Sequence, residues 1–405
     1  MKIDKVVVFH VGARDHYLIA EYFSKRKLLH IFITDYWIKP KSWISKMFPS
    51  VTSRRFNPRI EKEFITSYNL FYFLFSLLTK KLFAKNKFKL WIIHDSYFAK
   101  WASRKVSDGV KNNGNYLIWG YTNASLEVLN AYKDRRNVVT LHNQIDPGIE
   151  YYRIQEKLSI EHPFCETRVI ESSSEFLNRV STEWRLADII LVNSTYSKQS
   201  LLKHGVPGNK IVVVPLPFSN NYNVKPQPRM ISTSKLKVGF VGNINLIKGF
   251  DLFFKSAFIL NSEMDFVAVG NVLMADDYIS EAKKYITFKG HLSKLEMVEL
   301  YQDLDVLVFP TYSDGFGMVQ LEAMSFGVPV IASSNCGDVV VDGISGYIIE
   351  HDASAIVTRL RALDANRDLL QKFSIAAFER CLDFSYDNFQ LRLVAELAKH
   401  QVSIL

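Results

Sequence analysis

The chain of 405 residues is poor in cysteine, with only Cys165, Cys336 and Cys381, which lie far apart. An odd number of widely spaced cysteines argues against a disulfide framework and favours a reducing compartment such as the cytoplasm. The sequence also lacks a secretory signal pattern, internal repeats and low-complexity tracts. Neither half has Gly-x-Gly-x-x-Gly after its first strand, which disfavours a nicotinamide-dependent oxidoreductase.

No apolar run is long enough to cross a membrane. A spanning helix needs about 20 apolar residues, and the apolar segment 64–83 is interrupted by Asn69, Lys80 and Lys81. Further basic residues flank it, namely Arg54, Arg55, Lys85, Lys87 and Lys89. The segment is either a helix on an anionic membrane surface or a buried helix with a basic exposed rim. We favour the first interpretation, and with it a cytoplasmic protein that contacts the inner face of the membrane.

Charge is distributed unevenly along the chain. Residues 1–150 hold 25 Lys and Arg against 12 Asp and Glu, a net charge of +13, whereas the remaining 255 residues have a net charge of −4. This asymmetry predicts a polyanionic partner for the first half alone. Since no nucleic-acid recognition motif is present, we expect a membrane or a phosphorylated substrate and no nucleic acid.

Short apolar runs alternate with segments of helical pattern throughout the chain, which is typical of doubly wound α/β domains. The runs expected to form strands are 6–11, 28–33, 90–93, 116–119, 138–141, 187–194, 211–215, 237–242, 266–269, 286–289, 306–309, 328–331 and 346–349. A polar, proline-rich stretch separates two such series. We therefore predict a first Rossmann-like domain over 1–217, a linker over 218–235, a second Rossmann-like domain over 236–383 and a C-terminal helix over 384–405 that crosses back to the first domain.

The richest motif lies after the run 306–309. Asp314 and Glu322 are separated by seven residues, and between them a Gly-x-Gly turn opens a helix. A strand, a glycine turn and a helix N-terminus together form an anion site, because free backbone amides and the helix dipole point at the ligand. Carboxylates beside such a site suit hydroxyl groups. The motif therefore predicts a ligand with both phosphate and sugar.

From about residue 180 to 330 the chain resembles the nucleotide-sugar glycosyltransferases of family 4, which have the two-domain GT-B fold and retain anomeric configuration. Four motifs in order carry the resemblance. They are 187–194 with Lys198 and Gly205, 241–243 with Lys248 and Gly249, 303–310, and 314–322 with 327–330. The segment 383–387 also resembles the C-terminal part of the family. The first 140 residues match only in strand pattern.

The resemblance implies a donor site in the second domain, for a UDP- or GDP-linked sugar and without a metal or other cofactor. Asp314 would contact the donor sugar, Glu322 the ribose, and Lys248 the diphosphate, where a cation offsets charge on the leaving group. Gly242 and Asn243 would lie at the same site. The backbone amides of the turn would cap the diphosphate, at Gly315, Phe316, Gly317, Met318 and Val319. The chain departs from the family at Asn243, where an arginine is common, and at Asp314, where glutamate is usual.

The resemblance also implies residues on the first domain. His142 would face the donor sugar across the cleft, and the loop with Gly12 and Arg14 would face the acceptor. The expected reaction is front-face substitution at the anomeric carbon, with a hydroxyl of a cell-envelope glycan or glycolipid as acceptor.

Simpler interpretations stay open for several of these residues. Asp314 could be a helix N-cap, Glu322 a surface carboxylate, Lys248 a solvated loop charge and His142 a buried polar residue. Asp303-x-Asp305 has the spacing of a metal motif, but it precedes a buried strand and is expected to cap helix and strand ends. Two rival functions are a sugar-nucleotide epimerase on the same fold and a catalytically inactive sugar-nucleotide-binding subunit.

Overall fold

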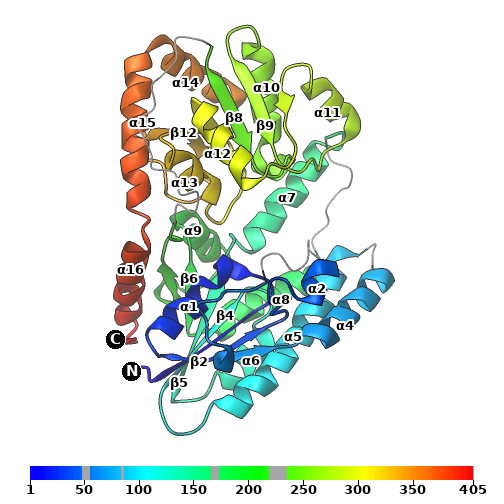
Figure 1. Cartoon of the computed structure of the whole chain (residues 1–405), viewed down its shortest axis with the longest axis vertical. Coiled ribbons are helices and arrows are strands. Elements are labelled where there is room, and N and C mark those ends of the chain that lie inside the picture. Colours follow the sequence, from blue (N-terminus) through cyan, green and yellow to red (C-terminus); the bar gives the residue numbers. More distant parts are fainter. Residues whose placement is uncertain (48–54, 84–85, 166–172, 219–234, 405) are drawn as a thin grey trace.

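The computed structural model describes residues 1–47, 55–83, 86–165, 173–218 and 235–404. It has two α/β domains, each built on one parallel sheet with helices packed against it (Figure 1). The first domain is the lower half of Figure 1 and the second domain the upper half. The predicted doubly wound architecture is confirmed.

The first sheet has seven parallel strands in the order β3-β2-β1-β4-β5-β6-β7. Its strands are β1 Lys5–His10, β2 Leu29–Thr34, β3 Ile65–Ser67, β4 Tyr116–Tyr121, β5 Val138–Gln144, β6 Ile189–Val192 and β7 Ile211–Val213. Four consecutive residues of β1, Val6 to Phe9, are fully buried, as expected for a parallel strand covered on both faces.

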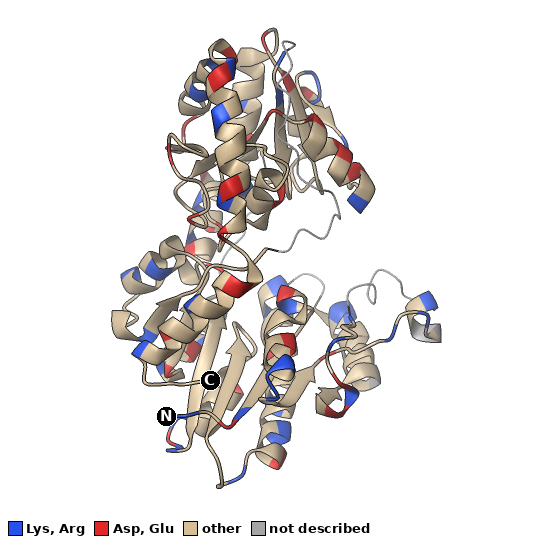
Figure 2. Cartoon of the chain, turned by 60° about the vertical axis from the view of Figure 1, so that its left-hand side comes forward, with Lys and Arg blue, Asp and Glu red and all other residues tan. Residues whose placement is uncertain are grey.

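The helices of the first domain connect these strands. They are η1 Arg14–Tyr17, α1 Leu18–Lys25, α2 Trp43–Met47, η2 Lys62–Phe64, α4 Asn69–Leu82, α5 Lys87–Gly109, α6 Leu126–Tyr132, α7 Ile149–Glu161, α8 Ser174–Leu186, α9 Thr195–Lys203 and η3 Gly208–Lys210. Basic positions are spread over this domain (Figure 2).

The predicted strand at 90–93 is wrong. These residues lie inside α5, whose buried positions Phe88, Phe98, Ala102 and Val106 recur at helical spacing. The short β3 pairs with β2 at the edge of the sheet instead. A four-residue apolar run does not by itself distinguish a strand from one face of a buried helix.

The second sheet has six parallel strands in the order β10-β9-β8-β11-β12-β13. Its strands are β8 Lys237–Val241, β9 Asp265–Val269, β10 Thr287–Phe288, β11 Val306–Phe309, β12 Val330–Ser333 and β13 Gly346–Ile349. The helices that follow are η4 Leu246–Lys248, α10 Phe250–Leu260, α11 Asp276–Ala282, α12 Lys294–Asp303, α13 Met318–Met324, α14 Ala353–Ala365, α15 Arg367–Leu382 and α16 Tyr386–Lys399.

Two helices tie the domains together. Tyr152 of α7 packs in a first-domain core cluster, whereas Leu158 of the same helix packs in the core of the second domain. At the other end of the chain, Leu393 and Leu397 of α16 lie in the core that contains β1 and β2, although α15 covers the second domain (Figure 1). The linker expected over 218–235 falls mostly outside the described residues.

Both sheets have a switch point, where the chain stops adding strands on one side and continues on the other. The switch lies between β1 and β4 in the first sheet and between β8 and β11 in the second. Ligands of open parallel sheets bind outside the carboxyl ends of the strands at this point. The two switch points therefore locate the loops in which functional side chains are expected.

Candidate functional site

The loop after β8 holds Lys248 in a fixed position. Asn245 accepts a hydrogen bond from the Lys248 amide, and Gly249 takes the left-handed conformation with φ 75°. A Cβ at Gly249 would lie 2.0 Å from the carbonyl oxygen of Pro310, just after β11. Only glycine lets the two loops approach this closely. The loop that carries Lys248 is thus held against the loop that carries Asp314.

Lys248 and Asp314, both predicted donor-site residues, form an ion pair. Lys248 Nζ lies 2.5 Å from Asp314 Oδ2, and each side chain is 21% exposed. Asp314 Oδ1 also accepts a weak hydrogen bond from the Phe316 amide at 3.4 Å. The N-cap of α13 is Gly317, so the alternative of Asp314 as a helix N-cap is wrong.

The glycine turn brings the second domain against the first. A Cβ at Gly315 would lie 2.0 Å from the Ile145 carbonyl oxygen, directly after β5 of the first domain. Gly317 has φ 80° and is packed against the ring of Phe309. The side chain of Phe316 is buried in a second-domain core cluster. The turn therefore allows the two domains to pack closely, and it also leads into the first residue of α13.

Met318 and Val319 form the first turn of α13, and both are partly buried. Their amides lie before the first intrahelical hydrogen bond, as in every helix. Glu322, one turn further, accepts a hydrogen bond from Tyr301 Oη at 2.9 Å and is partly buried. Glu322 is therefore held by a neighbouring helix, α12, rather than free in solvent.

Gly242 and Asn243 lie where β8 ends. Gly242 has φ 144°, and no atom lies within 4 Å of a Cβ built there. Its carbonyl oxygen instead packs against Gly270, where a Cβ would approach it to 1.8 Å. The side chain of Asn243 is exposed. This edge of the second domain is thus open at the position where the family commonly has an arginine.

The loop after β1, with Gly12 and Arg14, is the equivalent loop of the first domain. The Gly12 amide donates to Asp35 Oδ1 at 3.0 Å, and the Arg55 guanidinium binds the same carboxylate. Three consecutive residues that are not glycine, Asp15, His16 and Tyr17, then have positive φ values of 46°, 49° and 66°. Such strain persists only where the surrounding structure enforces it, and it is common at functional sites.

Tyr121, at the end of β4, holds this strained turn. Its Oη donates to Asp15 Oδ2 at 2.9 Å. Burial raises the pKa of the Asp15 carboxyl, and the hydrogen bond from Tyr121 opposes the shift. Neither residue was predicted as part of the site from the sequence. The available signal was a tyrosine at the end of β4 and an aspartate in the loop after β1.

Arg14 lies among carboxyl groups of the first domain. Burial raises the pKa of Asp15, Asp95 and Asp146, to about 7 for Asp95, and the charge of Arg14 lowers it in all three. Arg14 is partly buried, and its guanidinium donates no hydrogen bond within the part of the chain that the structure describes. Among the described residues, Arg14 therefore acts on these carboxyl groups through its charge and not through a hydrogen bond.

Asp146 is a further residue that sequence analysis missed. It accepts hydrogen bonds from Gln144 Nε2 at 2.7 Å and from the Gly148 amide at 2.8 Å. Its Cα would lie 3.0 Å from a Cβ at Gly315. The Asp-Pro-Gly turn after β5 thus packs its backbone against the glycine turn of the second domain, while the Asp146 carboxyl is bonded within the first domain.

His142 is buried within the first domain. Its side chain has no exposed area, its Nε2 lies 3.1 Å from Gln144 Oε1, and Glu183 Oε2 is 4.0 Å away. Burial lowers its pKa, against the charge of Glu183. The Nδ1 atom is buried, and no described residue gives it a hydrogen-bond partner. The structure does not bring His142 to the surface shared with Lys248 and Asp314.

Direct hydrogen bonds connect the two domains beside this site. The Thr195 amide, at the start of α9, donates to Asp338 Oδ2 at 2.9 Å. Tyr196 Oη donates to Ser313 Oγ at 3.1 Å, next to Asp314. The site is therefore built from the carboxyl ends of both sheets.

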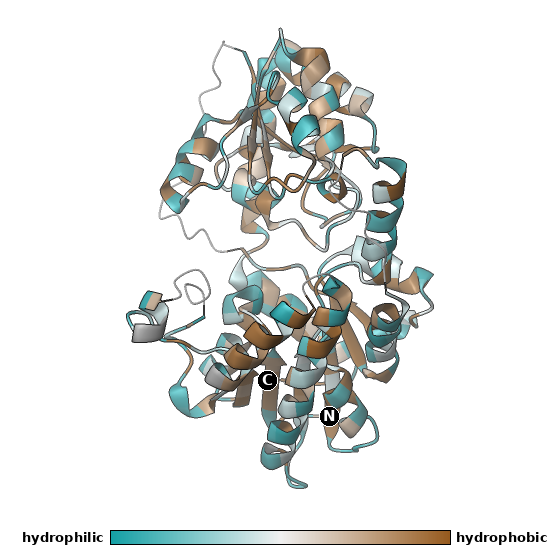
Figure 3. Cartoon of the chain, turned by 90° about the vertical axis from the view of Figure 1, so that its right-hand side faces the viewer, coloured by the Kyte–Doolittle hydropathy of each residue, from teal (hydrophilic) through white to brown (hydrophobic). Residues whose placement is uncertain are grey.

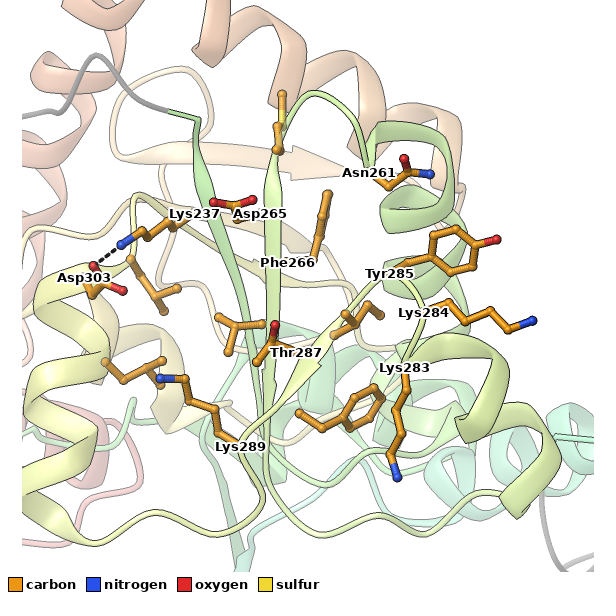
Figure 4. Close-up of a pocket in the computed structure, with 16 residues that line it drawn as sticks. Lys237, Asn261, Asp265, Phe266, Lys283, Lys284, Tyr285, Thr287, Lys289 and Asp303 are labelled. Atoms are coloured by element: carbon orange, nitrogen blue, oxygen red, sulfur yellow. Dashed lines mark hydrogen bonds and ion pairs between the residues drawn. The ribbon is translucent and has the colours of Figure 1, made fainter.

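Neither the Asp-x-Asp motif nor the pocket at the edge of the second sheet coincides with this site. Asp305 Oδ2 accepts from the Lys237 amide and so caps the start of β8, as expected, whereas Asp303 forms an exposed ion pair with Lys237 Nζ. Within the described residues, no group of three or more His, Cys, Asp or Glu side chains could hold a metal ion. A pocket of about 790 Å³ lies at the β10 edge of the second sheet, and Figure 4 shows its lysines, but no predicted site residue lines it.

Comparisons with known proteins agree with this geometry. Residues 235–366 match the family model described as Glycosyl transferases group 1. The match lies within the second domain, which is therefore similar to glycosyltransferases of this group. The chain is 27% identical over 201 residues to the capsular polysaccharide biosynthesis glycosyltransferase CapM of Staphylococcus aureus, which covers 44% of this chain and 52% of CapM. It thus spans about half the length of the curated relatives it matches.

Solved structures match almost the whole chain. Sucrose-phosphate synthase from Thermosynechococcus elongatus superposes with a TM-score of 0.65 at 16% identity, over 98% of this chain and 99% of that one. Anabaena HepE in complex with UDP and glucose gives a TM-score of 0.62 at 13% identity, over 97% and 99%. The GT-B fold is confirmed, and the match to the Glycosyl transferases group 1 model supports the predicted resemblance to glycosyltransferases.

Proposed function

We propose that the protein is a retaining glycosyltransferase that moves a sugar from a nucleoside diphosphate sugar to a hydroxyl of a cell-envelope glycan or glycolipid. The observation that carries this proposal is the Lys248–Asp314 ion pair. It lies at the switch point of a group 1 domain, beside a glycine turn that contacts the first domain. CapM, a capsular polysaccharide glycosyltransferase, supports an envelope glycan as the product class.

The ion pair gives each partner a role in the transfer. The Lys248 ammonium has three N–H groups, so it can donate to a diphosphate oxygen while it keeps its bond to Asp314. The second oxygen of Asp314 bonds a hydroxyl of the donor sugar. As the bond between the anomeric carbon and the phosphate oxygen breaks, negative charge grows on that oxygen beside Lys248. Fixed charges of this kind lower the barrier, because they need no reorganisation.

Bond formation occurs on the same face of the sugar. The acceptor oxygen attacks the anomeric carbon, and its proton passes to the phosphate oxygen that leaves. No protein nucleophile takes part in this step. Arg14 and Asp146, on the first-domain side, position the acceptor by charge and hydrogen bonding. Glu322 binds the ribose of the nucleotide, and a UDP- or GDP-linked donor fits these groups.

The net charge of +13 in residues 1–150 further supports contact between the first domain and an anionic membrane. Among the described residues, no helix combines the length and the apolar character that spanning a bilayer requires. We therefore propose peripheral contact at the cytoplasmic face.

A sugar-nucleotide-binding subunit without activity is the second candidate. Asn243 supplies no cation to the leaving-group site, and the charge of Lys248 is already balanced by Asp314. Such a subunit would bind the donor without turnover.

Thermal-shift measurements with UDP, GDP, ADP and CMP and their common sugars test the proposal, followed by nucleotide-release assays with and without an envelope lipid extract. We expect one nucleoside diphosphate to raise the melting temperature and the extract to stimulate its release. The Glu322→Ala variant should lose the stabilisation by nucleotide. Binding without release would favour the inactive subunit, and conversion of the sugar nucleotide without an acceptor would favour an epimerase. No shift with any nucleotide would contradict the proposal.

A further inference from the structure

Helix α4, on the outer side of the first domain, has an apolar face that no part of the described chain covers. Five of its large apolar side chains are more than half exposed. They are Phe71 at 69%, Leu74 at 55%, Leu77 at 52%, Leu78 at 61% and Leu82 at 66%. The spacing of 71, 74, 78 and 82 puts these residues on one side of a helix. A contiguous apolar stripe on a helix surface, unlike single exposed residues, marks an interaction site.

The opposite face of α4 is firmly packed. Tyr72, Ser76 and Thr79 are buried, and Thr79 Oγ1 is hydrogen-bonded to His94 Nε2 of α5. The rings of Phe75 and Tyr97 stack with centroids 3.9 Å apart. The exposed face is therefore held in place by α5 rather than being a loosely attached segment. Figure 3 turns this side of the molecule to the viewer, and apolar positions come forward on the helices of the lower domain.

Charge along α4 and the start of α5 is of one sign. From residue 64 to residue 94 the sequence has no Asp or Glu. Lys80 and Lys81 form the exposed last turn of α4, and Lys87 and Lys89 are exposed at the start of α5. Lys87 Nζ lies 4.5 Å from the ring centre of Trp91, so this end of the surface combines lysines with an aromatic ring. Apolar residues that end in a cluster of lysines match the boundary between acyl chains and anionic headgroups.

The N-terminal end of α4 is joined to the candidate acceptor loop. The Asn69 amide donates to the Asp35 carbonyl oxygen at 2.8 Å, and Asn69 Oδ1 accepts from the Trp37 amide. The Asp35 carboxylate holds the amide of Gly12. A partner surface that binds along α4 therefore reaches close to the loop that carries Arg14.

We infer that α4 lies in the plane of an anionic lipid bilayer, with its apolar stripe among the acyl chains and its lysines at the headgroups. The helix has 14 residues and is about 21 Å long, too short to span. The biological purpose of this membrane contact rests on the proposed function. The contact puts the acceptor loop beside a membrane from which a lipid-linked acceptor can enter.

Vesicle flotation of the full chain tests the surface. We expect binding to vesicles of phosphatidylcholine with about 30% phosphatidylglycerol, as in a strongly anionic membrane, and little binding to phosphatidylcholine alone. The double variant Phe71→Ser and Leu78→Ser should weaken binding about tenfold or more, and Lys80→Glu with Lys81→Glu should weaken it most at low salt. The matched controls are Leu391→Ser, at an equally exposed leucine, and Lys283→Glu with Lys284→Glu on the second domain.

Three outcomes would overturn the inference. The first is equal flotation of wild type and the α4 variants, and the second is no flotation of wild type at all. The third is a dimer in analytical ultracentrifugation that the Phe71 and Leu78 changes dissociate, which would make a second copy the occupant. Nucleotide-induced thermal shifts separate this test from the proposed function. Intact shifts without vesicle binding would refute only the membrane surface, and vesicle binding without any nucleotide shift would refute only the transferase.

Discussion

The two switch-point loops of this protein occupy equivalent places in two sheets of the same strand order, yet they are built differently. After β8, the left-handed positions are glycines, and the single cation Lys248 is paired with Asp314. After β1, the positive-φ positions are Asp15, His16 and Tyr17, and the cation Arg14 has no hydrogen-bond partner in the described structure.

This difference separates the roles of the domains. Glycine adopts a left-handed conformation at little cost, so the second loop is relaxed before a ligand binds. The first loop stores strain of about 1–3 kcal/mol per residue and depends on the hydrogen bond between Tyr121 and Asp15. A donor that related enzymes share favours a relaxed loop, whose conformation glycine allows. An acceptor that is particular to one protein favours a loop whose conformation is fixed by its own side chains.

The largest expected effect is from Lys248→Ala. Loss of the cation beside the leaving group should lower kcat by about 100- to 1000-fold, equivalent to about 3–4 kcal/mol. Steady-state nucleotide release measures it, with Lys399→Ala as a control at an exposed paired lysine. Wild-type turnover in Lys248→Ala would refute the assignment of the donor site.

Gly315→Ala tests whether the turn must approach the first domain. The new Cβ would meet the Ile145 carbonyl 2.0 Å away, so the domains must separate at the site, and kcat should fall about 10- to 100-fold. Gly208→Ala is the matched control, because its Cβ would meet only the end of the Leu202 side chain at 3.3 Å. Equal activity of the two variants would show that the observed contact is not needed.

A pH effect on stability is expected from His10, the last residue of β1, which precedes the strained loop. Burial lowers the pKa of His10 from 6.5 to about 3, so the unfolded chain takes up this proton first. The stability is complete above pH 6.5 and is lost as the pH falls toward 3, by about 2 kcal/mol at pH 5. The melting temperature should therefore fall from pH 7 to pH 5, and less so in His10→Phe. Parallel slopes for both proteins would contradict the prediction.

Arg14→Gln should act on the acceptor alone. Removal of a charge that faces the ligand should raise the acceptor KM about tenfold and leave nucleotide-induced thermal shifts unchanged. Arg59→Gln serves as the control, since Arg59 is exposed and paired with Glu21. A changed nucleotide affinity in Arg14→Gln would move Arg14 to the donor side.

The smallest effect on turnover is expected from His142→Asn. Because the imidazole is fully buried, its loss should lower the melting temperature and change turnover at about 20 °C by less than about threefold. A turnover rate that drops about 100-fold while the melting temperature stays the same would support contact between His142 and the sugar.

Local patterns in the sequence were enough to establish the α/β alternation, the strand–turn–helix with Asp314 and Glu322, and the position of Lys248, because these depend on periodicity and on glycine at tight turns. Long-range packing was needed to establish that 90–93 is helical, that Lys248 and Asp314 form a pair, that His142 is buried and that Tyr121 holds Asp15. Each of these depends on contacts between segments far apart in the chain, and such contacts leave no local pattern in the sequence. The apolar run in α4 is the intermediate case. Its composition was visible in the sequence, whereas packing on α5 determined which of its residues face outward.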